Sequence, residues 1–245
     1  MLVRADLHVH TVLSPCAEVD MIPPLIVERA LDLGLDLISI TDHNSSANAA
    51  AVMQAARGSS LKVLPGMELM TREEVHVTCL FDTVEQLRQW QVQVDHALPD
   101  LPNRADRFGE QFVVDASGDF VRREERMLLV AANIALENAV ACVNAMGGIA
   151  IPAHIDRPAN GLIAMLGFLP LSLQIDAVEI SKNISANIAR TKYSIPDKVA
   201  VIQSSDAHWL DALGSAVTKF EFRQSRNVIE LLAALKEKRY QIIGN

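Results

Sequence analysis

The chain alternates between short apolar runs and longer segments with apolar residues at helical spacing. Seven runs have the length and composition of buried strands: Val3–Leu7, Asp36–Thr41, Leu61–Pro65, Val75–Phe81, Gly148–Pro152, Ala177–Ile180 and Val199–Gln203. The intervening pattern predicts helices at Pro23–Leu33, Ala47–Arg57, Thr83–Ala97, Arg123–Met146, Ile163–Gly167, Ser185–Arg190 and Asn227–Lys238. Strands that alternate with helices indicate βαβ units and a parallel sheet. Seven strands in 245 residues favour a closed or nearly closed barrel, with an open doubly wound sheet as the alternative.

One stretch, Asp95–Arg122, breaks this alternation. It carries the turn formers Pro99, Pro102 and Gly109, and it ends in two short apolar runs around Ala116–Asp119. This pattern predicts a β-hairpin. We expect it to be an insertion on the barrel rim, at 95–122, within a single domain that spans residues 1–245.

The composition is that of an ordinary globular protein, with 50% apolar and 21% charged residues. A chain of this length buries a core without help from metals, so a metal site would be functional. The net charge of −8 works against sequence-independent nucleic-acid binding, which needs lysine and arginine to neutralise phosphates. A small phosphorylated substrate is compatible with this charge, since bound divalent ions reverse the field locally.

The cysteines and the apolar runs bear on the compartment. Three scattered cysteines do not make a disulfide framework, and no basic-then-apolar leader opens the chain, so we expect a reducing cytoplasm. The longest charge-free run, Pro158–Ile175, is interrupted by asparagine, glycine and proline, and we expect no membrane span.

Six of the seven histidines lie in a predicted strand or near its end, and two acidic residues join them. The set is His8, His10, His43, His76, His154 and His208, with Glu68 and Asp206. In a β/α barrel the carboxyl ends of the strands converge on one mouth. Imidazoles and carboxylates gathered there are ligands for transition metals, and more than four of them indicate more than one ion. The alternatives are that single histidines are ordinary polar residues, or that four of them form a regulatory zinc site.

The motifs that contain these residues resemble one known family. They are Asp6-Leu7-His8-Val9-His10-Thr11 with Ser14, Ile40-Thr41-Asp42-His43-Asn44, Pro65-Gly66-Met67-Glu68, Val75-His76-Val77, Pro152-Ala153-His154 and Ser205-Asp206-Ala207-His208. Together they resemble the PHP (polymerase and histidinol phosphatase) superfamily from Ala5 to about Gly214. The resemblance implies a distorted seven-stranded β/α barrel of the TIM type, two or three divalent metal ions, and hydrolysis of phosphoesters.

The resemblance also implies a division of the ligands. One metal would be held by His8, His10, Glu68 and Asp206; a second by Glu68, His76 and His154; and a third by His43 and His208. The family often has a further histidine or aspartate ligand shortly after the first histidine pair, and Cys16 is closest to that position. A thiolate would favour zinc over manganese. The alternative for Cys16 is a small buried residue in a turn, with Glu18 or Asp20 as the ligand instead.

The ligand types indicate the chemistry. Mixed imidazole and carboxylate ligands suit zinc, manganese or iron, and such ions activate water and neutralise charge on a phosphoryl group. We assign Glu68, Asp206 and His208 to catalysis, and Asp42 to orienting a ligand imidazole or capping its strand. Arg157 and Lys182 are candidates for binding the substrate phosphate, and a surface salt bridge is the alternative for each.

Three further functions remain as alternatives. Some PHP relatives are attached to DNA polymerases, so the chain could be a nuclease or exonuclease. Similar barrels hydrolyse non-phosphate bonds as amidohydrolases do. The chain could also be a non-catalytic metal-binding regulatory module. The sequence carries no signal for a particular substrate or oligomeric state.

Overall fold

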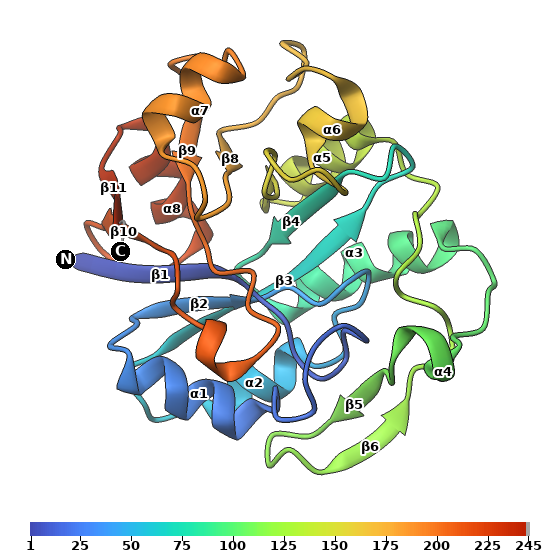
Figure 1. Ribbon diagram of the computed structural model, residues 1–245. Helices are drawn as coiled ribbons and strands as arrows, with labels where there is room; N and C mark the ends of the chain where they lie inside the picture. The colour runs from blue at the N-terminus through green and yellow to red at the C-terminus, as the bar shows by residue number, and fades with distance from the viewer. Residues whose placement is uncertain (244–245) are drawn as a thin grey trace.

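The structure is a computed structural model that describes residues 1–243. Its strands within that range are β1 (Leu2–Val9), β2 (Leu37–Ile40), β3 (Lys62–Met70), β4 (His76–Leu80), β5 (Phe112–Val114), β6 (Phe120–Arg123), β7 (Ile149–Pro152), β8 (Ala177–Glu179), β9 (Ala200–Ile202), β10 (Val217–Glu221) and β11 (Tyr240–Ile243). Its helices are α1 (Pro23–Asp32), α2 (Ala49–Ala55), α3 (Val84–Ala97), α4 (Ala105–Phe108), α5 (Leu136–Ala145), α6 (Leu162–Leu166), α7 (Ala186–Lys192) and α8 (Val228–Lys236), with a 3-10 turn η1 at Leu210–Ala212. Figure 1 shows α1 and α2 together on one side of β1 and β2, with α6 and α7 at the opposite end of the molecule.

Seven strands form one curled sheet in the order β11-β10-β1-β2-β3-β4-β7. Only β1, β2 and β3 pair in parallel; the other pairs in this sheet are antiparallel. The expected parallel pairing therefore holds only for β1, β2 and β3, and the expected seven-stranded sheet is curled but not closed into a barrel. The α/β class is right, but the sheet is a half-barrel, because the short turn after β3 returns the chain directly to the neighbouring position as β4. The strands β10 and β11, which the pattern did not predict, extend the other edge.

The strands β8 and β9 form a separate parallel pair. Backbone hydrogen bonds connect this pair to both sides of the large sheet near the carboxyl ends of the strands. The Ile155 amide after β7 donates to the Glu179 carbonyl, and the His10 amide donates to the Ala207 carbonyl beyond β9. The seam between the two sheets is thus bridged at the end where the histidines lie.

The strand β3 changes partner halfway along its length. Its first half pairs with β2, and from Gly66 onward it pairs with β4. A Cβ at Gly66 would lie 2.8 Å from Ser39 Oγ and 3.0 Å from Leu80 Cδ2, so only glycine fits this crossing point. The sequence pattern predicted a strand that ends at Pro65, which would place Glu68 after it. Because β3 continues through the crossing to Met70, Glu68 lies within the strand instead.

The segment after the predicted hairpin also differs from the sequence prediction. The hairpin is present as β5–β6, but the helix predicted from Arg123 begins only at Leu136. The buried Gln111 side chain donates to the carbonyls of Glu124 and Arg126 and accepts from the Leu128 amide. These long-range bonds hold the backbone extended where local pattern favours helix. No helix within residues 1–243 combines the length and the apolar composition needed to span a bilayer.

Candidate metal centre

All eight predicted histidine and acidic ligands converge at one end of the curled sheet, and each is buried or nearly so. They come from β1 (His8) and the residue that follows it (His10), the loop after β2 (His43), β3 (Glu68), β4 (His76), the loop after β7 (His154) and the loop after β9 (Asp206, His208). Three groups among them bring one ligand atom per residue within 4.8 Å of each other: His8, His10, Glu68 and Asp206; His43, Glu68 and His76; and His10, His43 and His208.

Glu68 is the centre of the cluster. Its Oε1 lies 2.8 Å from His76 Nδ1 and 3.1 Å from His154 Nε2. Its Oε2 lies 2.9 Å from His43 Nδ1. One fully buried carboxylate therefore faces imidazoles from three different elements, as a bridging ligand would.

Asp206 faces the histidine pair of β1. Its Oδ1 lies 3.0 Å from His10 Nε2 and 3.2 Å from His8 Nε2, and His8 Nε2 is also 3.2 Å from Glu68 Oε1. The two imidazoles point to the same side of the strand because residues two apart in a strand share a face.

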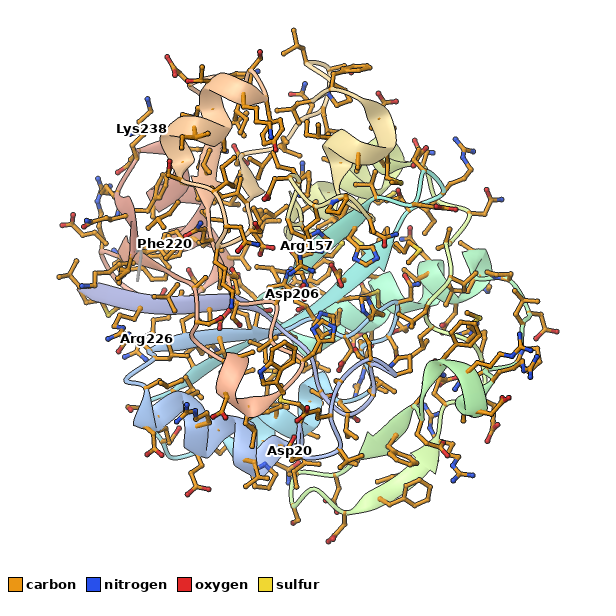
Figure 2. All side chains as sticks on the ribbon, in the orientation of Figure 1. Asp20, Arg157, Asp206, Phe220, Arg226 and Lys238 are labelled. Carbon is orange, nitrogen blue, oxygen red and sulfur yellow. The ribbon has the colours of Figure 1, made fainter. Side chains whose placement is uncertain are left out.

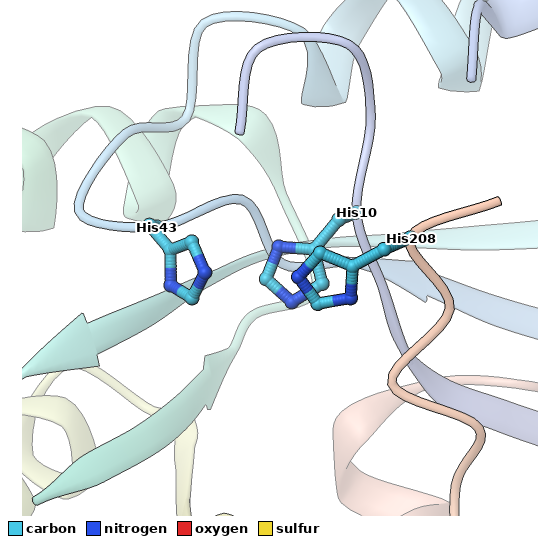
Figure 3. Close-up of side chains that lie close together, drawn as sticks. All are labelled: His10, His43 and His208. Carbon is cyan, nitrogen blue, oxygen red and sulfur yellow. The ribbon is translucent and has the colours of Figure 1, made fainter. Parts of the chain in front are cut away.

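The third group joins three histidines from different segments (Figure 3). The ring centroids of His10 and His208 are 4.1 Å apart, and those of His10 and His43 are 4.5 Å apart. Cys16 is an exposed residue, yet its thiol hydrogen-bonds with both His208 and His43. Partial desolvation of the sulfur opposes ionisation, but these hydrogen bonds lower the pKa of the Cys16 thiol to about 6.

Many buried ligand atoms in the cluster form no well-aligned hydrogen bond, although several lie 2.8–3.4 Å from a nitrogen or oxygen of a neighbouring ligand. They are His8 Nε2, His10 Nε2, His43 Nδ1, Glu68 Oε2, both ring nitrogens of His76, His154 Nδ1 and Asp206 Oδ1. Buried polar atoms are otherwise nearly always paired, so this concentration needs an explanation. The donor set of nitrogens and carboxylate oxygens is suited to divalent transition metals.

Charge balance supports the same conclusion. Five carboxylates are buried in or around the cluster: Asp6, Asp42, Glu68, Glu179 and Asp206. Among the described residues, Arg157 is the one lysine or arginine that forms an ion pair with any of them. Burial alone would raise the pKa of Glu68, but the imidazoles of His76 and His8 hold it well below its usual range. Without a metal, the buried carboxylates are thus balanced mainly by imidazoles, a role that divalent cations would take over when bound.

A second layer of contacts fixes the imidazoles. His10 Nδ1 lies 2.9 Å from Ser14 Oγ, and Ser14 Oγ donates to Asp42 Oδ1 at 2.7 Å. Asp42 also accepts from the amide and the hydroxyl of Thr11. Asp42 thus acts on a histidine through Ser14 rather than directly. Sequence reasoning missed one residue of this layer, Glu179, whose signal was a carboxylate inside the apolar strand Ala177–Ile180.

Arg157 lies beside the cluster, as Figure 2 shows, with its Nη1 2.5 Å from Asp206 Oδ2. A pocket of about 280 Å³ opens onto the cluster and is lined by His43, Glu68, His76, His154, Arg157, Pro158, Ala159, Asn160, Asp206 and His208. Lys182 lies elsewhere: it lines a separate pocket and is 3.5 Å from Ser215 Oγ. The structure brings one of the two predicted phosphate-binding residues to the cluster and not the other.

Two of the predicted ligands have an unusual backbone. His154 and Asp206 have φ values of 29° and 51°, in the left-handed region that non-glycine residues rarely adopt. Such conformations cost about 1–3 kcal/mol each and cluster at functional sites. The surrounding contacts, including a bond from the His154 amide to Glu179 Oε1 at 3.1 Å, hold this geometry.

Known structures share the fold. The lesion-specific endonuclease PfuEndoQ from Pyrococcus furiosus is 21% identical with a TM-score of 0.75, over 99% of this chain and 58% of that one. Endonuclease Q in complex with a 27-mer duplex bearing an abasic lesion is 20% identical with a TM-score of 0.68, over 97% of this chain and 57% of that one. A "putative metal-dependent phosphoesterase" from Bifidobacterium adolescentis is 20% identical with a TM-score of 0.53, over 83% and 87% of the two chains. The chain thus spans less than two thirds of both endonucleases.

Sequence comparison gives the family. No curated protein matches the chain. The family model of the PHP domain matches residues 6–157, which hold eight of the eleven residues predicted as metal or phosphate ligands, and the PHP-associated model matches residues 183–240. The chain belongs to the PHP domain family.

Proposed function

We propose that the chain is a metal-dependent phosphoesterase that hydrolyses a small phosphorylated metabolite or nucleotide. The observation that carries this proposal is the concentration around Glu68 of buried nitrogens and carboxylate oxygens that form no well-aligned hydrogen bond. Two or three divalent ions, of zinc, manganese or iron, would bind there. When bound, such ions activate water and neutralise the charge that develops on a phosphoryl group.

The proposed ligand sets follow the three groups of the cluster. His8, His10, Glu68 and Asp206 would hold one ion; His43, Glu68 and His76, with His154 beside them, a second; and His10, His43 and His208, with the Cys16 thiolate, a third. Neighbouring sets share Glu68, His10 or His43, so the exact division depends on which ring nitrogen each histidine offers.

Catalysis would rest on three residues with different positions in the site. Glu68 and Asp206 would orient the reacting groups through their fixed carboxylates. His208 has the most exposed imidazole of the cluster, 16%, and lines the pocket. Burial opposes protonation of the ring, but hydrogen bonding with Cys16 and the charge of Asp206 raise its pKa in the metal-free protein. As a metal ligand the ring would be neutral, and it would act by holding an ion at the pocket, next to the substrate.

Arg157 would bind the phosphate at the mouth of the pocket. Its side chain is 42% exposed, and its guanidinium is already held beside the cluster by Asp206. A planar guanidinium can donate two parallel hydrogen bonds to two phosphate oxygens. Lys182 lines another pocket, so we do not assign it to phosphate binding. The three free cysteines suit a reducing compartment, and we propose the cytoplasm.

The test is hydrolysis by protein reconstituted with zinc or manganese, offered phosphomonoesters, phosphodiesters, nucleotides and a p-nitroanilide. Glu68→Gln, prepared in parallel, identifies contaminating activity. Phosphate release by the parent and not by the variant supports the proposal. Turnover of the anilide alone would favour an amidohydrolase, and metal binding without any turnover would favour a regulatory module.

A second candidate is a DNA lesion endonuclease, favoured by the fold shared with Endonuclease Q over nearly the whole chain. The surface argues against it. Four arginines around the rim hairpin are paired with acids: Arg104 with Asp106, Arg122 with Glu124, Arg123 with Glu110 and Arg126 with Asp95. Incision of a duplex that contains an abasic site or a deaminated base, but not of an intact duplex, would favour the endonuclease.

A further inference from the structure

Glu179 is a buried carboxylate to which neither the sequence nor the proposed function assigns a role. It is the last residue of β8 and is 2% exposed, between the buried apolar residues Val178 and Ile180. A buried carboxylate is costly unless it is paired and hydrogen-bonded, so its contacts indicate what it does.

The contacts of Glu179 all lead to the metal centre. Its two oxygens lie 3.1 and 3.3 Å from His8 Nδ1. Its Oε1 also accepts from the His154 amide at 3.1 Å. Within residues 1–243, His8 is the one basic side chain that forms an ion pair with Glu179.

The two ring nitrogens of His8 therefore face different groups. Nδ1 faces Glu179, whereas Nε2 lies 3.2 Å from both Glu68 Oε1 and Asp206 Oδ1. A proton on Nδ1 is donated to the carboxylate, and the lone pair is then on Nε2, on the side of the other ligands. A carboxylate that fixes the tautomer of a ligand histidine also raises its basicity.

We propose that Glu179 is a positioning residue that holds His8 as the Nδ1–H tautomer and thereby sets the metal affinity of the group His8, His10, Glu68 and Asp206. The inference rests on the proposed metal centre, and it is independent of the substrate. The competing explanation is that Glu179 only ties β8 to the large sheet through the His154 amide.

The first experiment measures metal affinity. Glu179→Gln keeps the size of the side chain but removes its charge and one acceptor. We expect the affinity for zinc at one site, measured by competition with a chromogenic chelator, to fall about 10- to 100-fold. The melting temperature of the metal-free variant should stay close to that of the parent, since Glu68 and Asp206 still face His8. Unchanged affinity at every zinc site would overturn the proposal.

The matched control is Asp156→Asn. Asp156 joins the same two segments, after β7 and after β8, by accepting from the Ser181 amide at 2.7 Å and hydroxyl at 2.6 Å. Within residues 1–243 its carboxylate forms no hydrogen bond or ion pair with a histidine. We expect this variant to keep the zinc affinity of the parent. An equal loss in both variants would show that only the attachment of β8 matters, and would overturn the proposal.

The second experiment does not depend on a variant that folds. Nitrogen-15 NMR of the parent, loaded with zinc, distinguishes the two tautomers of His8. We expect the proton on Nδ1, and a proton on Nε2 would overturn the proposal. Neither experiment measures hydrolysis, so a failure of phosphoester turnover would leave these results interpretable and would count against the proposed function alone.

Discussion

Arg157 and Asp206 form an ion pair in which only one carboxylate oxygen takes part: Arg157 Nη1 lies 2.5 Å from Asp206 Oδ2, while Oδ1 faces His10 Nε2 at 3.0 Å. Each oxygen of Asp206 therefore has its own partner. Arg157 contacts a candidate metal ligand and also lines the substrate pocket. Its removal therefore tests whether it binds the phosphate or holds Asp206 in place.

We expect Arg157→Ala to lower kcat/KM by roughly ten- to a hundredfold, because a charge-assisted contact to phosphate contributes about 1.5–3 kcal/mol. Metal content should be retained, because Asp206 keeps its contacts with His10 and His8. Arg157→Lys should recover only part of the loss, since a point charge does not reproduce the paired geometry. Steady-state kinetics and metal analysis on the same preparations check this, with His154→Ala as the variant that loses metal. If Arg157→Ala loses metal as well, the arginine serves mainly to hold Asp206.

Glu68→Gln should lose at least one ion of the two or three expected per chain, together with most activity. An amide is a poor bridge between cations, and Glu68 faces three of the histidines. Metal analysis after zinc or manganese reconstitution measures the stoichiometry. Glu74→Gln, in the exposed turn after β3, is the control and should behave as the parent. One ion or none in the parent would contradict the multinuclear site.

Cys16 should react with iodoacetamide near neutral pH in metal-free protein. Its pKa of about 6 is below the ordinary thiol value, so the thiolate fraction is small below pH 5 and nearly complete at pH 7. The alkylation rate should rise through pH 6 and level off, and bound zinc should suppress it. Cys16→Ser identifies the reacting thiol against Cys79 and Cys142. Equal alkylation with and without zinc would show that Cys16 is not a ligand.

The loop of the rim hairpin should tolerate shortening, whereas its base should not. Replacing Asp115–Asp119 by Asn-Gly removes an exposed turn and should leave metal content intact while it changes substrate preference. By contrast, Asn48 donates to the Phe112 carbonyl and accepts from the Val114 amide. Asn48→Ala should therefore lower the free energy of unfolding by about 1–3 kcal/mol, measured by urea denaturation. Global unfolding of the loop variant would mean that the hairpin belongs to the core.

The sequence predicted the candidate site better than the sheet. His8, His43, His154 and Asp206 could be identified because each follows an apolar strand, and this local signal does not depend on which strands are neighbours. The order of the strands does depend on long-range pairing. The strand β10 carries Lys219 and Glu221 and reads as a surface segment, but it pairs antiparallel with β1 from the other end of the chain. No local pattern contains that information.

The missed residue and the misplaced helix have the same physical origin. Glu179 follows an apolar run without a neighbouring histidine, and its function comes from His8, which is 171 residues away in sequence. The segment after Arg123 has a helical pattern, but the side chain of Gln111 donates to the backbone carbonyls of Glu124 and Arg126, and these bonds are incompatible with a helix there. In both cases a buried polar group is satisfied by a partner that is remote in the chain.

The seam beside β8 and β9 has a consequence for local stability. These two strands share no ladder with the large sheet, yet Glu179, Asp206 and His208 belong to their side of the seam and contact His8 and His10 on the other. Ions bound between the two sides would act as a cross-link, so opening of the β8–β9 unit would require their release. Amide hydrogen exchange in Ala177–Glu179 and Ala200–Ile202 should then be slow in the loaded protein and accelerate after chelation, while exchange in β1 and β2 changes far less.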